Sequence, residues 1–139
     1  MNKNDSSGCV CGFHHVAVRV ADFDAAVAFY VNGIGLKEKI SWGEGDGRAV
    51  MLDAGNGNYV ELFAGGTAEE KPEGAMLHLA LRTDDVDAAL SRAVAAGATV
   101  TVEPKDVTIQ SRPQPTPVRL AFCRTPSGEI IEFFQNEST

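Results

Sequence analysis

Positive charge, cysteine and long hydrophobic runs are all scarce in this chain of 139 residues. It has 12 Lys and Arg against 19 Asp and Glu, for a net charge of -7, and such a chain repels the phosphates of nucleic acid. No apolar run approaches the roughly 20 residues that cross a bilayer. The polar start MNKNDSSG also lacks the apolar stretch of a signal peptide. We therefore expect a cytoplasmic protein with neither a nucleic-acid partner nor a membrane partner.

The three cysteines have no spacing typical of a disulfide framework. Cys9 and Cys11 form a C-x-C pair near the start, and Cys123 is far from both. A structural zinc site usually has four ligands, so we interpret all three cysteines as free thiols. Residues 1–11 are expected to form a mobile N-terminal tail.

The sequence contains an internal repeat. The segment HVAVRVADFDAAV, from His15, matches HLALRTDDVDAAL, from His78, at an offset of 63 residues. Further along, YVELF around Glu61 matches IIEFF around Glu132 at an offset of 71 residues. Two halves with the same pattern indicate two copies of one supersecondary unit.

Each half has the pattern of a strand, a helix and three further strands. Asp22 is placed to cap a helix over FDAAVAFYVN, and Gly33 is expected to end it in a left-handed conformation. The second helix, VDAALSRAVAA, is expected to end at Gly97. The strands that follow the helices are predicted in LKEKISW, RAVMLD and NYVELFA, and then in ATVTV, VRLAFCR and EIIEFFQ.

This order of elements predicts an α+β fold of two tandem βαβββ modules, in which a curved mixed sheet lines a cavity and the helices lie outside. The modules are placed at residues 12–64 and 75–136, with a polar linker at 65–74. The Pro-broken stretch 104–117 is interpreted as a long connection. Within it, residues 112–117 are either a lid or an ordinary surface crossing.

Alternation along the strands separates the histidines into two groups. Two equivalent sets lie opposite the aliphatic side chains that must pack on the helices: His15, Ala17 and Arg19 in the first half, and His78, Ala80 and Arg82 in the second. His14 corresponds to Leu77 and so belongs with the aliphatic set. We place it at the frayed start of its strand.

Glu61 and Glu132 stand at equivalent positions in apolar strands. Burying a carboxylate there is costly unless it is paired or binds a metal. Taken singly, a strand histidine is more often a satisfied core residue than a ligand, and a strand glutamate is often solvated. A twofold relation between the halves would bring two histidines and two glutamates together. That donor set suits a first-row divalent ion with positions left for water and substrate.

With these residues identified, the sequence resembles the vicinal oxygen chelate superfamily, which includes glyoxalase I, methylmalonyl-CoA epimerase, extradiol dioxygenases and bleomycin resistance proteins. The similarity runs from about Phe13 to Gln135 and is strongest in HHVAVRVADFDAAVAFYVNGIGL and RTPSGEIIEFFQ. It implies paired βαβββ modules that enclose a metal and bind a small molecule, commonly in a homodimer. It also implies four metal ligands: His15, Glu61, His78 and Glu132.

Within the superfamily, this ligand set resembles that of glyoxalase I (lactoylglutathione lyase), a metal-dependent lyase or isomerase. The resemblance implies one nickel, cobalt or zinc ion per site, with iron the weaker candidate. The ion would bind two neighbouring substrate oxygens and stabilise an enediolate while a proton moves next to a carbonyl. Glu132 would be the general base and Glu61 its counterpart. Arg19 matches an arginine that helps to hold the glutathione carboxylate, although a solvated strand-end charge explains it equally well.

Two departures from glyoxalase I argue against glutathione as a co-substrate. FAGGTAEEK replaces an Asn-Trp motif, and EPKDVTIQSRPQPTPVR lacks the Gly-rich substrate loop. Trp42, Phe63 and Phe122 either line an apolar pocket or belong to the core. The alternative functions are a metal-dependent epimerase, a ring-cleaving iron dioxygenase, and a metal-free resistance module that sequesters a small molecule. An intact ligand set counts against the last of these.

Overall fold

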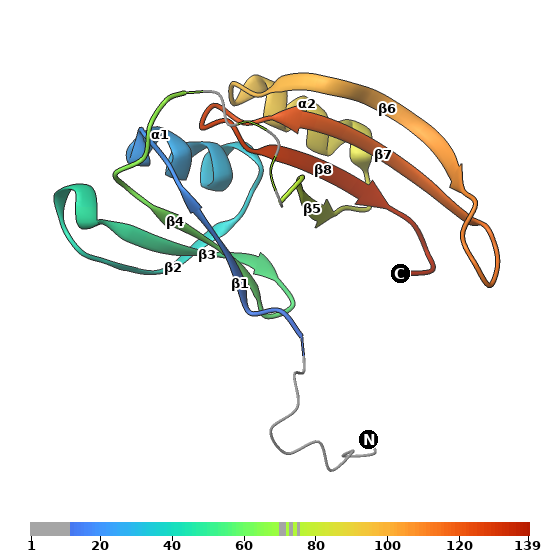
Figure 1. The fold of residues 1–139 in the computed structure, drawn as a ribbon, viewed down its shortest axis with the longest axis horizontal. Helices are drawn as coiled ribbons and strands as arrows, with labels where there is room; N and C mark the ends of the chain where they lie inside the picture. Colours follow the sequence, from blue (N-terminus) through green and yellow to red (C-terminus); the bar gives the residue numbers. More distant parts are fainter. Residues whose placement is uncertain (1–11, 70–71, 73, 75) are drawn as a thin grey trace, which may run out of the picture.

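A computed structural model describes residues 12–69, 72, 74 and 76–139 (Figure 1). The predicted tail 1–11, with Cys9 and Cys11, lies outside the described residues. The elements are, in chain order, β1 (His15–Arg19), α1 (Phe23–Ala28), the π-helical turn η1 (Phe29–Gly33), β2 (Lys37–Trp42), the 3-10 turn η2 (Gly45–Gly47), β3 (Ala49–Gly55), β4 (Asn58–Phe63), β5 (Leu79–Arg82), α2 (Val86–Ala95), β6 (Thr99–Ile109), β7 (Thr116–Arg124) and β8 (Ile130–Gln135). Within the described residues, no helix is long and apolar enough to cross a membrane.

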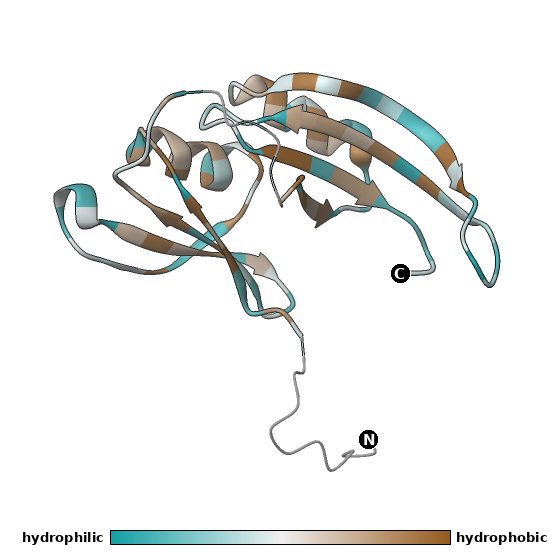
Figure 2. Cartoon of the chain, viewed as in Figure 1, coloured by the Kyte–Doolittle hydropathy of each residue, from teal (hydrophilic) through white to brown (hydrophobic). Residues whose placement is uncertain are grey.

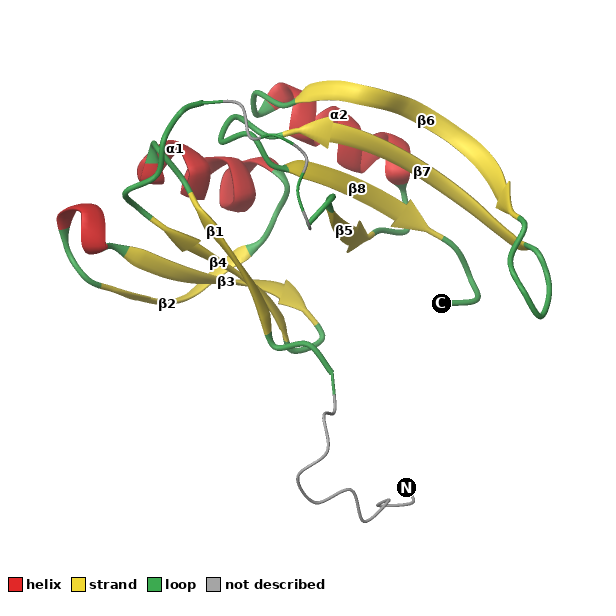
Figure 3. Ribbon diagram, viewed as in Figure 1, coloured by secondary structure: helices red, strands yellow, loops and turns green. Residues whose placement is uncertain are grey.

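The strands form two separate mixed sheets, one for each half of the chain (Figure 3). Their orders are β1-β4-β3-β2 and β5-β8-β7-β6, so the two halves share one topology. In each sheet the first and last strands of the half pair in parallel, and the other neighbours are antiparallel. The predicted α+β class and the tandem βαβββ modules are therefore confirmed. We call the halves module 1 (β1 to β4) and module 2 (β5 to β8).

The repeat extends to the residues that start the helices. As predicted, Asp22 caps α1: its Oδ1 accepts a hydrogen bond from the Ala25 backbone N–H at 3.0 Å. Asp85, 63 residues later, accepts one from the Ala88 N–H at 3.0 Å. A side-chain acceptor at this position satisfies a backbone donor that the helix leaves unpaired. The same local chemistry therefore starts both helices.

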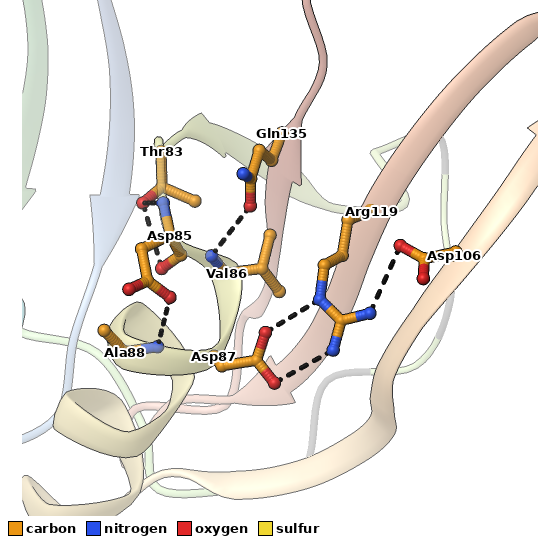
Figure 4. Close-up of polar contacts among 8 residues, drawn as sticks. All are labelled: Thr83, Asp85, Val86, Asp87, Ala88, Asp106, Arg119 and Gln135. Carbon is orange, nitrogen blue, oxygen red and sulfur yellow. Dashed lines mark hydrogen bonds and ion pairs between the residues drawn. The ribbon is translucent and has the colours of Figure 1, made fainter.

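Additional polar contacts fix α2 to its own sheet (Figure 4). Gln135 of β8 accepts a hydrogen bond from the Val86 N–H at 3.2 Å. Arg119 of β7 binds Asp87 of α2 through two hydrogen bonds, of 2.7 and 3.0 Å, and also lies 3.2 Å from Asp106 of β6. These side chains connect the first turn of the helix to three strands of the sheet.

The first helix ends differently from the prediction. Its last part widens into η1, and the left-handed residue is Gly35, with φ 91°, whereas Gly33 has no positive φ. Gly33 is required for another reason: a Cβ atom there would lie 2.5 Å from the Ala96 Cβ of module 2. The glycine permits a close approach between modules, which the local sequence could not reveal. Gly97, with φ 106°, follows α2 as predicted.

The predicted long connection at 104–117 is wrong, because most of it belongs to a β-hairpin. β6 continues to Ile109 and β7 begins at Thr116, which leaves residues 110–115 as the loop. Pro104 lies where the register shifts between Val102 and Lys105, on an edge strand. Edge strands and bulges are the positions at which a sheet tolerates a missing N–H. Residues 112–117 therefore span the hairpin loop and the start of β7.

One hydrophobic core spans both modules. It contains buried residues from both sheets and from the helical segments, among them Val20, Tyr30, Leu62, Val86 and Ile131. Hydrophobic and hydrophilic residues alternate along strands such as β6 (Figure 2). The remaining described cysteine, Cys123, is a buried free thiol, as predicted, and burial raises its pKa to about 11.

The modules are joined on the helical side. The Arg92 Nε–H of α2 donates a hydrogen bond to the Gly33 carbonyl at 3.0 Å. The Tyr30 hydroxyl of η1 donates one to Glu129, in the turn between β7 and β8, at 2.7 Å. Since the helices cover the aliphatic face of each sheet, the other face remains available for a site.

Candidate functional site

Strand register pairs each predicted histidine with a glutamate of its own module. In module 1, Ala17 of β1 lies opposite Glu61 of β4, and the His15 Nε2 is 3.8 Å from the Glu61 Oε1. In module 2, Ala80 of β5 lies opposite Glu132 of β8, and the His78 Nε2 is 3.4 Å from the Glu132 Oε1. The repeat therefore produces the same His–Glu pair twice.

Both pairs have the carboxylate inside and the imidazole nearer to solvent. Glu61 and Glu132 are 7% and 8% exposed, whereas the side chains of His15 and His78 are 39% and 35% exposed. Burial raises the pKa of Glu132, and the neighbouring His78 partly offsets this effect. A buried carboxylate of this kind is costly to ionise without a cationic partner.

The four predicted ligands form two pairs and not one cluster. Among the described residues, no group of three or more His, Cys, Asp or Glu side chains gathers as it would around a metal ion. Both histidines do line one cleft of about 890 Å³, together with Tyr59 of β4 and Phe134 of β8. A single chain thus presents two separate two-donor half-sites.

The chemistry of each half-site fits a divalent metal. Two ligands that are each about 2.1 Å from one ion are separated by about 3.0 to 3.4 Å in octahedral or tetrahedral geometry. The His78–Glu132 separation of 3.4 Å falls in this range, and the His15–Glu61 separation of 3.8 Å lies just outside it. Each pair can therefore supply half of a four-donor set with small side-chain adjustments.

The open face of module 1 combines the half-site with an apolar row. Register places one residue from each strand in this row: Arg19, Phe63, Ala49 and Trp42. The Trp42 and Phe63 rings meet edge to face with centroids 6.2 Å apart. Trp42 is 43% exposed and Ala49 between them has a short side chain, so the row offers an apolar surface beside Glu61.

Arg19 stands at the β1 end of this row. Its Nη1 donates a hydrogen bond to the Ala64 carbonyl at 2.8 Å, and its Cζ lies 5.5 Å from the centre of the Phe63 ring. These contacts orient the guanidinium, which has five N–H donors, on the same face as Glu61. An oriented cation beside an apolar row can bind an anionic group of a ligand.

Phe122 provides the aromatic contact in module 2. It lies opposite Glu132 in the β7–β8 ladder, and its ring meets the His78 ring edge to face at 5.3 Å. Trp42, Phe63 and Phe122 all stand on the faces that carry the His–Glu pairs, and none belongs to the buried core cluster. Of the two readings of these aromatics, the structure supports residues of the site face.

His14 is the site residue whose contacts the strand pattern did not predict. It is exposed immediately before β1, not packed with the aliphatic set, and its Nδ1 lies 3.0 Å from the His15 Nδ1. The His14 ring also contacts Tyr59, with centroids 5.1 Å apart. The available signal was the pair of adjacent histidines where the repeat has Leu77 and His78.

Sequence comparisons place these residues in a known family. The model of the Glyoxalase/Bleomycin resistance protein/Dioxygenase superfamily matches residues 12–133. The uncharacterized protein YwbC of Bacillus subtilis (strain 168) is 32% identical over 125 residues, which cover 87% of this chain and 94% of that protein. A probable lactoylglutathione lyase of Vibrio cholerae serotype O1 is 32% identical over 129 residues, which cover 88% of this chain and 89% of that protein.

Solved structures give the same result for the fold. TnmS3, an antibiotic binding protein from Streptomyces sp. CB03234, has a TM-score of 0.67 and 27% identity, over 92% of this chain and 98% of that chain. A glyoxylase/bleomycin resistance protein/dioxygenase domain from Frankia sp. EAN1pec has a TM-score of 0.75 and 17% identity, over 93% and 94% of the two chains. At 17% identity the second likeness supports the fold alone.

Proposed function

The chain belongs to the Glyoxalase/Bleomycin resistance protein/Dioxygenase superfamily, and on this premise we propose that it is a metal-dependent lyase or isomerase of the glyoxalase I type. It moves a proton next to a carbonyl of a small-molecule substrate. The observation that carries the proposal is the twice-repeated His–Glu pair, at 3.8 Å in module 1 and 3.4 Å in module 2. Similarity to a probable lactoylglutathione lyase supports the same reaction class.

One divalent ion per site is held by four ligands: His15, Glu61, His78 and Glu132. Two imidazole nitrogens and two carboxylate oxygens suit nickel, cobalt or zinc and leave positions for substrate oxygens. When bound, the ion acts as a Lewis acid on the substrate carbonyl.

Glu132 is the general base. Its carboxylate accepts the proton from the carbon next to the carbonyl and returns it to the neighbouring carbon, and Glu61 is its counterpart on the opposite side of the substrate. Burial keeps bulk water from Glu132 and raises its pKa, which favours a group that both accepts and returns a proton. Arg19 binds an anionic group of the substrate at the end of the apolar row.

The complete site forms between two chains of a homodimer. One chain brings only a pair of donors together in each module, whereas a catalytic metal site commonly has three protein ligands. Both site faces are open in the single chain: Ile40 and Trp42 are exposed on module 1, and the histidines are accessible on both modules. We place His15 and Glu61 of one chain opposite the partner's His78 and Glu132.

A complementation experiment tests both the ligands and the assembly. One variant carries His15→Ala and Glu61→Ala, the other carries His78→Ala and Glu132→Ala, and the two are co-expressed with different tags. A two-chain site restores one intact ligand set in the mixed dimer, with about half of the wild-type metal content and activity. A site within one chain restores neither.

The first measurement is elemental analysis of wild-type protein purified without chelators or an affinity metal. About one nickel, cobalt or zinc ion per chain supports the proposal, and activity is then sought with hemithioacetals and acyl-CoA esters in D2O. Deuterium next to the carbonyl of the product reports the proton transfer. Stoichiometric iron with oxygen consumption instead identifies a dioxygenase.

Sequestration of a small molecule without metal is the second candidate. TnmS3, at 27% identity, is an antibiotic binding protein, and the exposed Trp42 offers an aromatic surface for such a ligand. Since Trp42 is the only tryptophan of the chain, its fluorescence reports ligands that contact the row. A protein that takes up no metal but binds aromatic compounds with quenching of Trp42 would have this function.

A further inference from the structure

We propose that His14 is a positioning residue that fixes the tautomer of the metal ligand His15. The inference rests on the proposed function for its metal-binding consequence. The geometry that carries it is local: the His14 and His15 Nδ1 atoms are 3.0 Å apart, and the His15 Nε2 is directed toward Glu61. Second-shell partners of this kind commonly fix the orientation and tautomer of a ligating histidine.

A hydrogen bond between two Nδ1 atoms permits only certain proton positions. One nitrogen must donate and the other must accept, and a neutral imidazole carries a proton on one of its nitrogens. When the His15 Nδ1–H donates to the His14 Nδ1, the His15 Nε2 keeps its lone pair and can bind a metal. When His14 donates instead, the His15 proton moves to Nε2 and blocks that lone pair.

The surroundings favour the first arrangement. An Nε2–H on His15 would face the Glu61 Oε1 at 3.8 Å, which is too long for a hydrogen bond. The donor arrangement at Nδ1, by contrast, has an acceptor at 3.0 Å. His15 therefore gains a hydrogen bond only when its Nδ1 takes part, and its Nε2 is left free toward the metal side.

His14 is itself held in place from β4. The Tyr59 backbone N–H donates a hydrogen bond to the His14 carbonyl at 2.9 Å, and the Tyr59 ring lies 5.1 Å from the His14 ring at an interplanar angle of 32°. Tyr59 is also the register partner of His15. One strand residue thus supports the backbone and the ring that position the ligand.

The repeat supplies a matched control, because the position equivalent to His14 is Leu77. Leucine has no ring nitrogen, so His78 receives no such partner from the preceding residue. The inference therefore applies to module 1 alone and makes the two half-sites unequal. Leu77→Ala should leave the tautomer of His15 and the metal affinity unchanged.

The decisive measurement is the tautomer of His15 in metal-free, 15N-labelled protein, from long-range 1H–15N spectra at about pH 8, where imidazoles are neutral. The chain has three histidines, so single substitutions assign every ring. We expect His15 protonated on Nδ1 in the wild type and a mixture of tautomers in His14→Ala and His14→Phe. His14→Phe keeps a ring against Tyr59 and removes only the acceptor, whereas His14→Asn restores an acceptor and should recover the Nδ1–H form.

Metal affinity is the second measurement. His14→Phe should bind nickel or zinc about tenfold more weakly than the wild type, with His14→Asn in between. Wild-type His15 protonated on Nε2, or a His14→Phe variant with unchanged tautomer and affinity, overturns the inference. If wild-type protein binds no metal, the proposed function fails, and the tautomer comparison still decides the role of His14.

Discussion

Tyr30 and Glu129 form a buried hydrogen bond that connects the two modules. The fully buried Tyr30 hydroxyl donates to the Glu129 Oε1 at 2.7 Å, and Ser127 donates to the same carboxylate at 2.7 and 2.8 Å. Burial, followed by the charge of Glu129, raises the pKa of Tyr30 well above its usual value. The contact spans the boundary between η1 and the β7–β8 turn and therefore contributes to keeping the modules in register.

Tyr30→Phe is expected to lower the free energy of unfolding by about 1.5 to 3 kcal/mol, because it removes a donor from a buried charged acceptor. Urea denaturation monitored by circular dichroism measures the change. Tyr59→Phe is the control, since the Tyr59 hydroxyl makes no hydrogen bond to another described residue. A Tyr30→Phe protein within about 0.5 kcal/mol of the wild type would show that this bond contributes little to the packing of the modules.

The stability of the metal-free protein should depend on the ionisation of Glu132. Its folded-state pKa is raised by burial, so this residue contributes stability below its unfolded pKa of about 4.5, and the contribution is lost as the pH rises through the folded-state value. Glu132→Gln removes the ionisation. The variant should therefore gain unfolding free energy relative to the wild type between about pH 4 and pH 7.

Thermal unfolding across this pH range measures the difference between the two proteins. Glu69→Gln, at an exposed position, is the control and should follow the wild type. A gap between Glu132→Gln and wild type that does not change with pH would show that burial of the charged carboxylate has no cost in this fold.

The repeat allowed most of the fold to be predicted from the sequence. Matching His15 with His78 and Glu61 with Glu132 placed equivalent residues at equivalent register positions, and the structure has both pairs. Asp22 was predicted to start a helix for the same local reason. These features depend on short-range patterns, namely strand alternation and capping, which a sequence states directly.

The features that the sequence did not predict depend on contacts between distant segments. Gly33 allows the approach of Ala96, and Pro104 is accommodated by a register shift against β7. The bond between His14 and His15 requires a ring orientation supported by Tyr59. How the two half-sites combine is a question of the same kind, because one chain keeps them in separate sheets.

Arg19→Ala tests the proposed substrate contact. The guanidinium is oriented by Ala64 and Phe63 on the face of Glu61, so its removal should raise KM by about tenfold for substrates with a carboxylate, with a smaller effect on kcat. Metal content should not change. Arg112→Ala, in the exposed hairpin loop, is the control. An equal rise in KM for neutral substrates would instead indicate a packing role for Arg19.

Glu132→Gln separates proton transfer from metal binding. The amide keeps the size of the side chain and an oxygen donor but cannot accept the proton, so we expect turnover to fall by at least about 100-fold while most of the metal is retained. Initial rates on a substrate that the wild type converts, with elemental analysis of the same samples, measure both quantities. Glu61→Gln is the matched variant from the other half-site, and a smaller loss there would identify Glu132 as the principal base. Full activity of Glu132→Gln would exclude that role, and equal losses in both variants would indicate that the two glutamates share the proton.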